Sequence, residues 1–178
     1  MIEVEVKGYA DKEGLKKLRE VCELIEEKRQ VDLYFNHPSR DFRETDEALR
    51  IRIDEFKGIK KYFLTYKGPK LDEKSKTREE VEVEVEDAQK MAKLLDKLGF
   101  RKTLEIVKRR WVFKHGEYML FFDEVEGLGT FIEVETTVEN LNEFPLKRDE
   151  MIDFLKEIGV NKLERRSYLE LALEKLKL

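Results

Sequence analysis

Apolar and charged residues alternate along several short segments, and a period of two is typical of β-strands whose two faces differ. Val or Ile alternates with Glu in residues 2–7, 81–86 and 132–135. The whole pattern predicts eight strands, over residues 2–7, 30–36, 49–54, 61–67, 78–86, 104–114, 118–125 and 131–137. Glycine-containing turns at residues 114–117 and 127–129 predict that the last three strands pair antiparallel.

Other segments repeat their apolar residues at helical spacing and predict four helices, over residues 11–27, 87–98, 147–158 and 168–177. Asp11 and Asp87 are the expected N-caps of the first two. The single cysteine, Cys22, falls in the apolar stripe of the first helix, with Leu15, Leu18 and Ile25. It is therefore predicted to be a core thiol, and one cysteine excludes an internal disulfide.

The helices are expected to cover the apolar face of the sheet, including Val81, Val83 and Val85, so that the charged faces gather on the other side. A charged face on one strand is ordinarily a solvent face. However, Phe63 and Phe121 share the charged side of their strands, which a solvated surface does not require. We therefore predict one α+β domain over residues 1–178, an eight-stranded antiparallel closed barrel or tunnel with a polar interior and amphipathic helices outside.

Composition narrows the classes of function. Among 178 residues, Lys+Arg number 36 and Asp+Glu number 40, giving a net charge of -4, so the chain has no general attraction for nucleic acid. Apolar runs are too short for a membrane span, and the first residues form a charged strand instead of a leader. We expect a cytoplasmic protein with no nucleic-acid or membrane partner, and the sequence leaves a homodimer open.

The charged faces carry both signs. Carboxylates provide the oxygen ligands that Mg²⁺ and Mn²⁺ prefer, and lysine and arginine can match a triphosphate. The candidate metal ligands are Glu3, Glu5, Asp123, Glu133 and Glu135. The candidate phosphate-binding residues are Lys7, Arg50, Arg52, Lys67, Arg78, Lys108 and Arg110. The two sets could equally pair with each other, but buried pairs are costly unless a ligand or metal organises them.

Glu3-Val4-Glu5-Val6-Lys7 resembles the E-x-E-x-K motif of the CYTH superfamily, also called triphosphate tunnel metalloenzymes. The resemblance continues along the chain at residues 32–36, 40–42, 45–52, 65–69, 108–110, 122–125, 127–129, 131–135 and 166–168. It implies an antiparallel tunnel in which the acidic set holds one or two divalent metals, Mg or Mn, and the basic set holds a triphosphate. Lys74 or Lys76 could take the role assigned to Arg78.

The resemblance also implies a reaction. Residues 32–52 are similar to class IV adenylyl cyclases, which convert ATP to cyclic AMP and pyrophosphate, and Glu5, Glu133 and Lys67 are the candidate catalytic residues. A triphosphatase that hydrolyses thiamine triphosphate or inorganic triphosphate would use the same charges. A third alternative is a protein that binds nucleotide or polyphosphate without turnover.

Overall fold

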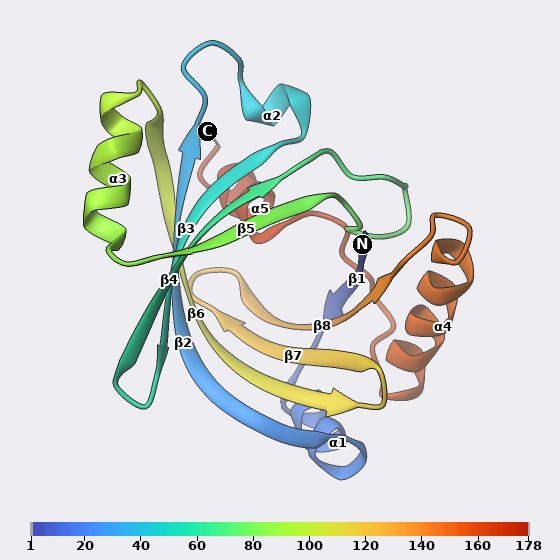
Figure 1. The fold of residues 1–178 in the computed structure, drawn as a ribbon. Helices are drawn as coiled ribbons and strands as arrows, with labels where there is room; N and C mark the ends of the chain where they lie inside the picture. Colours follow the sequence, from blue (N-terminus) through green and yellow to red (C-terminus); the bar gives the residue numbers. More distant parts are fainter. Residues whose placement is uncertain (1, 178) are drawn as a thin grey trace.

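The computed structural model describes residues 2–177, which form one eight-stranded sheet and five helices (Figure 1). The strands are β1 (Ile2–Tyr9), β2 (Glu23–Asn36), β3 (Ala48–Phe56), β4 (Ile59–Lys67), β5 (Glu80–Val85), β6 (Arg101–His115), β7 (Tyr118–Val125) and β8 (Gly129–Val138). The helices are α1 (Lys12–Val21), α2 (Phe42–Thr45), α3 (Ala88–Lys97), α4 (Phe144–Glu157) and α5 (Tyr168–Lys175).

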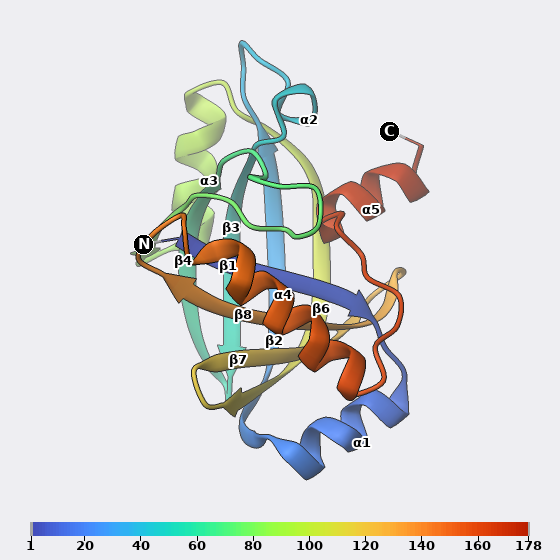
Figure 2. The ribbon, with the colours of Figure 1, turned by 90° about the vertical axis from the view of Figure 1, so that its right-hand side faces the viewer.

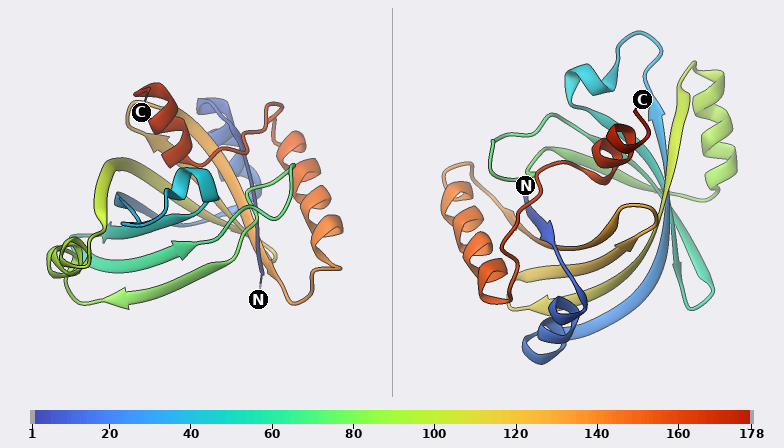
Figure 3. Two further views of the ribbon diagram at one scale, coloured as in Figure 1. Left: turned by 90° about the horizontal axis from the view of Figure 1, so that it is seen from above. Right: turned by 180° about the vertical axis from the view of Figure 1, so that it is seen from behind.

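All neighbouring strands pair antiparallel, in the order β1-β8-β7-β6-β2-β3-β4-β5, and the sheet curls around an interior (Figures 1 and 3). The edge strands β1 and β5 do not form a ladder. Instead the connection before β5 reaches β1, where Glu3 and Arg78 form a single bridge and Lys76 N donates to Glu5 O at 3.0 Å. The predicted antiparallel tunnel is thus confirmed as a curled half-barrel, and this connection spans its open side.

The long strands β2 and β6 pair along almost their full lengths and join the two halves of the sheet (Figure 1). This corrects the prediction of one helix over residues 11–27. Helix α1 ends at Val21, and Glu23 already pairs with Lys114. The local pattern of residues 23–29 fits the period of a helix as well as that of a strand, and pairing with β6 stabilises the strand. Cys22 is therefore the C-cap of α1, half-buried against the core, and Ile25 is an exposed strand residue.

Helices α1 and α4 cover the outer face of β1, β7 and β8 (Figure 2). The predicted N-cap of α1 is confirmed, because the Asp11 side chain accepts a hydrogen bond from Gly14 N. The core beneath contains the outward-facing residues of the strands, among them Val4, Val6, Ile132 and Val134. Trp111 also lies in this core, where it packs edge to face on Phe122 with ring centroids 5.6 Å apart.

Helix α3 covers the outer face of β3 and β4, with Leu95 fully packed. The cover stops before β5, because Val81 and Val83 are 55% and 53% exposed. The expectation that a helix buries these valines was wrong. The reason is topological: β5 is the edge strand beyond β4, and α3 follows it and crosses back over β3 instead.

Helix α5 differs from the other three long helices, because it packs against the inner face of the sheet at one end (Figure 3). Its first residue, Tyr168, joins a buried cluster with Tyr34, Ile106, Val125 and Phe131. These strand residues share the inward side with the charged positions, so α5 closes one end of the interior with apolar contacts. Within residues 2–177, the helices are too short and too polar to span a bilayer.

Candidate active site

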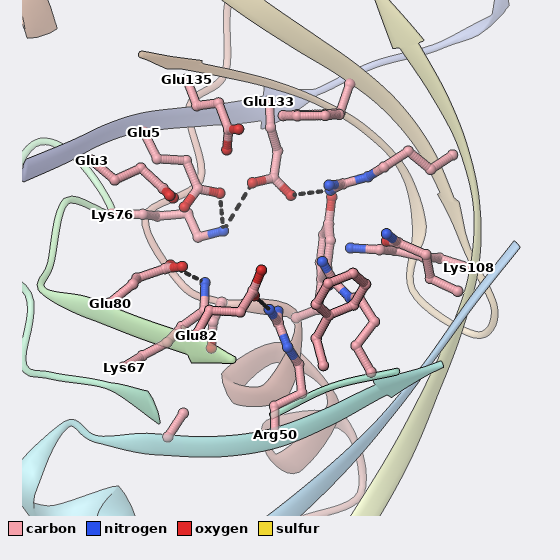
Figure 4. Close-up of a pocket in the computed structure, with 18 of the residues that line it drawn as sticks. Glu3, Glu5, Arg50, Lys67, Lys76, Glu80, Glu82, Lys108, Glu133 and Glu135 are labelled. Carbon is pink, nitrogen blue, oxygen red and sulfur yellow. Dashed lines mark hydrogen bonds and ion pairs between the residues drawn. The ribbon is translucent and has the colours of Figure 1, made fainter. Parts of the chain in front are cut away.

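Side chains from all eight strands, charged ones from every strand except β7, meet in one cavity of about 490 Å³ on the concave face (Figure 4). Phe63 and Phe121 line it too, as their strand positions predict. Of the twelve residues predicted from the sequence, ten line this cavity, namely Glu3, Glu5, Arg50, Arg52, Lys67, Arg78, Lys108, Arg110, Glu133 and Glu135. Period-two patterning therefore predicted which side chains share the interior.

The acidic side of the cavity is built from strands β1, β5 and β8. One carboxylate oxygen from each of Glu3, Glu5 and Glu80 lies within 4.8 Å of the others. Glu135 is the direct partner of Glu5 across the β1–β8 ladder, so it faces the same space. Such a set of partly or fully buried oxygen donors fits a hard divalent cation such as Mg²⁺ or Mn²⁺.

The pKa values of these carboxyl groups reflect their crowding. Burial, followed by repulsion from Glu135, Glu80 and Glu5, raises the pKa of Glu3 to about 8. Burial and the neighbouring Glu5 likewise raise the pKa of Glu135 to about 7. A bound divalent cation would favour the ionised forms of both groups.

A lysine lies between the central carboxylates. Lys76 Nζ is 2.8 Å from Glu5 and 3.1 Å from Glu133, and all three side chains are buried (Figure 4). Burial opposes ionisation of Glu5, but the charges of Lys76 and Lys67 prevail and lower its pKa. Lys67 in turn lies 2.5 Å from Glu80. The acidic cluster and the cations of the cavity are thus in direct contact.

The basic side is built from β3 and β6. Arg50 donates to Thr65 at 3.3 Å and lies 3.7 Å from Glu82, while its buried Nε has no partner among the described residues. Lys108 is 3% exposed in its side chain, and burial together with Arg110 holds its pKa well below the usual value. Buried donors of this kind can bind an anion in the cavity.

Two arginines are held by carboxylates of the sheet. Arg52 forms a bidentate pair with Asp32 at 2.7 and 2.8 Å, and Arg110 forms one with Asp123 at 2.7 and 2.6 Å. Bidentate pairing fixes the direction of each guanidinium group. Arg110 also reaches Glu133 at 3.4 Å, so it links the basic side to the acidic one.

Lys7 and Asp123 lie outside the lining of the cavity. Lys7 Nζ donates to Arg166 O at 2.5 Å and lies 4.0 Å from the centre of the Tyr168 ring. Asp123 is fully buried, where it accepts from Arg110 and from the Tyr168 hydroxyl, the latter at 2.7 Å. Tyr168, which lines the cavity, thus contacts both residues, and they hold its side chain in position.

Sequence reasoning assigned no role to Glu80, Asp32 or Tyr168. Glu80 has the same parity as Arg78 in the strand predicted over residues 78–86, and both line the cavity, so the same alternation could have identified it. Asp32 faces Arg52 across a ladder, a pairing that required the β2–β3 register. Lys76, an alternative to Arg78, lines the cavity as Arg78 does.

A cavity with clustered carboxylates on one side and buried cations on the other can hold a metal ion and a polyanion together. The CYTH domain model matches residues 1–168. One relative, "Putative adenylate cyclase MJ0240" from Methanocaldococcus jannaschii, is 46% identical over 96% of this chain and 98% of its own length. Another, "Adenylate cyclase CyaB" from Aeromonas hydrophila, is 31% identical over 87% of this chain and 78% of its own length. The solved PH1819 protein of Pyrococcus horikoshii is 53% identical, with a TM-score of 0.95 over 97% of this chain and 99% of that one. The chain therefore belongs to the CYTH domain family.

Proposed function

We propose that the protein is a divalent-metal-dependent enzyme acting on a triphosphate, and that it is an adenylyl cyclase of the class IV type. The observation that carries the proposal is the single cavity in which Glu3, Glu5 and Glu80 face the buried cations Arg50 and Lys108. The two relatives named above carry adenylate cyclase names, which supports ATP as the substrate.

The acidic residues would hold the metal. Glu3, Glu5 and Glu80 converge from two strands, and Glu133 and Glu135 face them from a third. When bound, Mg²⁺ or Mn²⁺ supplies a Lewis acid that lowers the pKa of an attacking hydroxyl group and neutralises phosphate charge.

The basic residues would hold the phosphates. Arg50 offers its unpaired buried Nε, and Arg110 is fixed in direction by Asp123. Lys67, 2.5 Å from Glu80, provides a cation beside the acidic cluster. In cyclisation, the ribose 3'-hydroxyl attacks the α-phosphorus and pyrophosphate leaves. These cations would stabilise the charge that develops on the departing pyrophosphate.

A triphosphatase is the second candidate. Among residues 2–177, β1 and β5 form no ladder, only the connection before β5 reaches β1, and the nearby Glu82 side chain is 46% exposed. Water can therefore approach the acidic side of the cavity, where the same charges would align it on a terminal phosphorus.

One assay separates the candidates. Purified protein is incubated with Mg²⁺ or Mn²⁺ and either ATP, thiamine triphosphate or inorganic triphosphate, and the products are resolved by chromatography. Cyclic AMP with pyrophosphate supports the cyclase, and released orthophosphate supports the triphosphatase. Tight binding without either product would contradict both and indicate a binding protein.

A further inference from the structure

A second cavity, also of about 490 Å³, lies between α2 and α5 beside the charged one (Figure 1 shows both helices). Its walls are largely apolar and include Phe35, Phe42, Leu169 and Leu173. Both phenylalanines are buried, which fixes their rings in place. Cavities of roughly 300–1,000 Å³ with aromatic and aliphatic walls are typical of sites for organic ligands.

The second cavity adjoins the charged cavity. Ala48, Arg78 and Ser167 line both of them. Arg78 is held at this boundary, because its guanidinium group donates to the backbone oxygen and to the Oδ1 of Asp46, at 3.5 and 3.4 Å. A ligand whose phosphates lie among the cations of the first cavity could therefore extend past Arg78 into the second.

The charged side chains around the second cavity already have partners of opposite charge. Asp46 and Glu170 share Lys70, at 2.7 and 2.9 Å from its Nζ. The remaining pairs are Arg78 with Asp46, Glu47 with Arg40, Arg43 with Asp41, and Glu174 with Arg166. With these charges compensated, the cavity favours an uncharged occupant over a cation.

We infer that the second cavity binds the nucleoside part of a nucleoside triphosphate. The base would lie among Phe35, Phe42 and the leucines of α5, where burial and aromatic contact stabilise a planar uncharged ring. This inference rests on the proposed function and makes it more specific. It favours a nucleotide over inorganic triphosphate, which has no organic group, and over thiamine triphosphate, whose thiazolium ring is a cation.

Equilibrium binding tests the inference. Calorimetry with Ca²⁺ compares three ligands, each recovered and checked for integrity afterwards: ATP with a methylene bridge between its α- and β-phosphates, inorganic triphosphate and thiamine triphosphate. The wild-type protein should bind the ATP analogue at least about tenfold more tightly than the other two.

Two substitutions narrow the second cavity from different walls, Leu169→Trp on α5 and Thr103→Trp on β6. Thr103 is exposed, so its replacement leaves the core intact. Each should weaken binding of the ATP analogue about tenfold and change the dissociation constant of inorganic triphosphate less than twofold. Leu176→Trp is the matched control, since Leu176 is exposed at the end of the same helix and should alter neither ligand.

The outcomes separate the two claims. Equal weakening of both ligands, or unchanged binding of the ATP analogue in folded variants, would overturn the nucleoside inference and leave the proposed function standing. Wild-type preference for inorganic or thiamine triphosphate would also overturn the inference. Failure of the wild-type protein to bind any of the three would overturn the proposed function and the inference with it.

Discussion

Replacing Glu5 by glutamine separates a metal-binding role from a structural one. The Glu5 carboxylate is buried, belongs to the cluster with Glu3 and Glu80, and accepts from Lys76 at 2.8 Å. Glutamine has the same shape and keeps an oxygen acceptor, but it removes the negative charge that a divalent ion requires.

The cost in stability should be modest. A hydrogen bond to a charged group contributes about 1.5–3 kcal/mol. Lys76 keeps Glu133 at 3.1 Å, and the change also removes repulsion between Glu5 and Glu135. We therefore expect Glu5→Gln to lower the free energy of unfolding by about 1–2 kcal/mol, which corresponds to a fall of roughly 2–8 °C in the melting temperature.

The cost in metal binding should be larger. Mutating residues that only support a metal ligand already costs about 10- to 100-fold in affinity or activity, so loss of a direct ligand should cost at least about 100-fold, or about 2.8 kcal/mol. Mn²⁺ titration and thermal unfolding of the same samples measure both quantities. Glu84→Gln is the control, because Glu84 is an exposed residue of β5 outside the cavity. Unchanged Mn²⁺ affinity, or a stability loss above about 4 kcal/mol, would refute the reasoning.

Three further predictions follow from buried contacts. Asp123→Asn should lower the free energy of unfolding by about 3 kcal/mol in urea denaturation, because it removes the ionised partner of the buried Arg110; a loss below about 1 kcal/mol would count against that pair. Gly8→Ala should destabilise by about 1–3 kcal/mol while Mn²⁺ affinity stays within threefold of wild type, because the added Cβ would lie 2.1 Å from Val160 Cγ1; an unchanged melting temperature would contradict this. The pKa of Glu3 is raised from 4.5 to about 8, so its ionisation opposes folding as pH rises through that window. Because the ionised carboxylate is the form that binds a metal, Mn²⁺ affinity should increase up to about pH 8. Affinity that is flat from pH 6 to 8 would show that Glu3 is not a ligand.

Much of the site follows from strand alternation alone. Once β1 is a strand with Val4 and Val6 in the core, Glu3 and Glu5 must point to the other face. The same rule places Arg50 and the other inward residues without any knowledge of which strands are neighbours.

Strand alternation did not predict which inward-facing side chains reach the cavity and which are buried beside it. Lys7 points to the inner face of the sheet, as predicted. However, Tyr168, which is distant in the sequence, packs against Lys7 and lines the cavity in its place. Asp123 was predicted beside a metal, and the long-range register instead gives its oxygens to Arg110. Such choices depend on contacts that no local pattern contains.

Segments with ambiguous or absent periodicity were the other limit. Residues 23–29 fit a helix as well as a strand until β6 supplies a partner. The connection before β5 has no period of two or 3.6, yet it places Lys76 between Glu5 and Glu133. The partial cover of β5, which leaves Val81 exposed, depended on the path of α3 across the sheet.

The most direct test of the central claim is the position of a metal ion and a triphosphate in crystals grown with Mn²⁺ and the methylene-bridged ATP analogue. Anomalous diffraction should locate Mn²⁺ at the oxygens of Glu3, Glu5 and Glu80, with phosphates on the side of Arg50 and Lys108. Well-ordered analogue outside this cavity, or Mn²⁺ bound away from these carboxylates, would contradict the account.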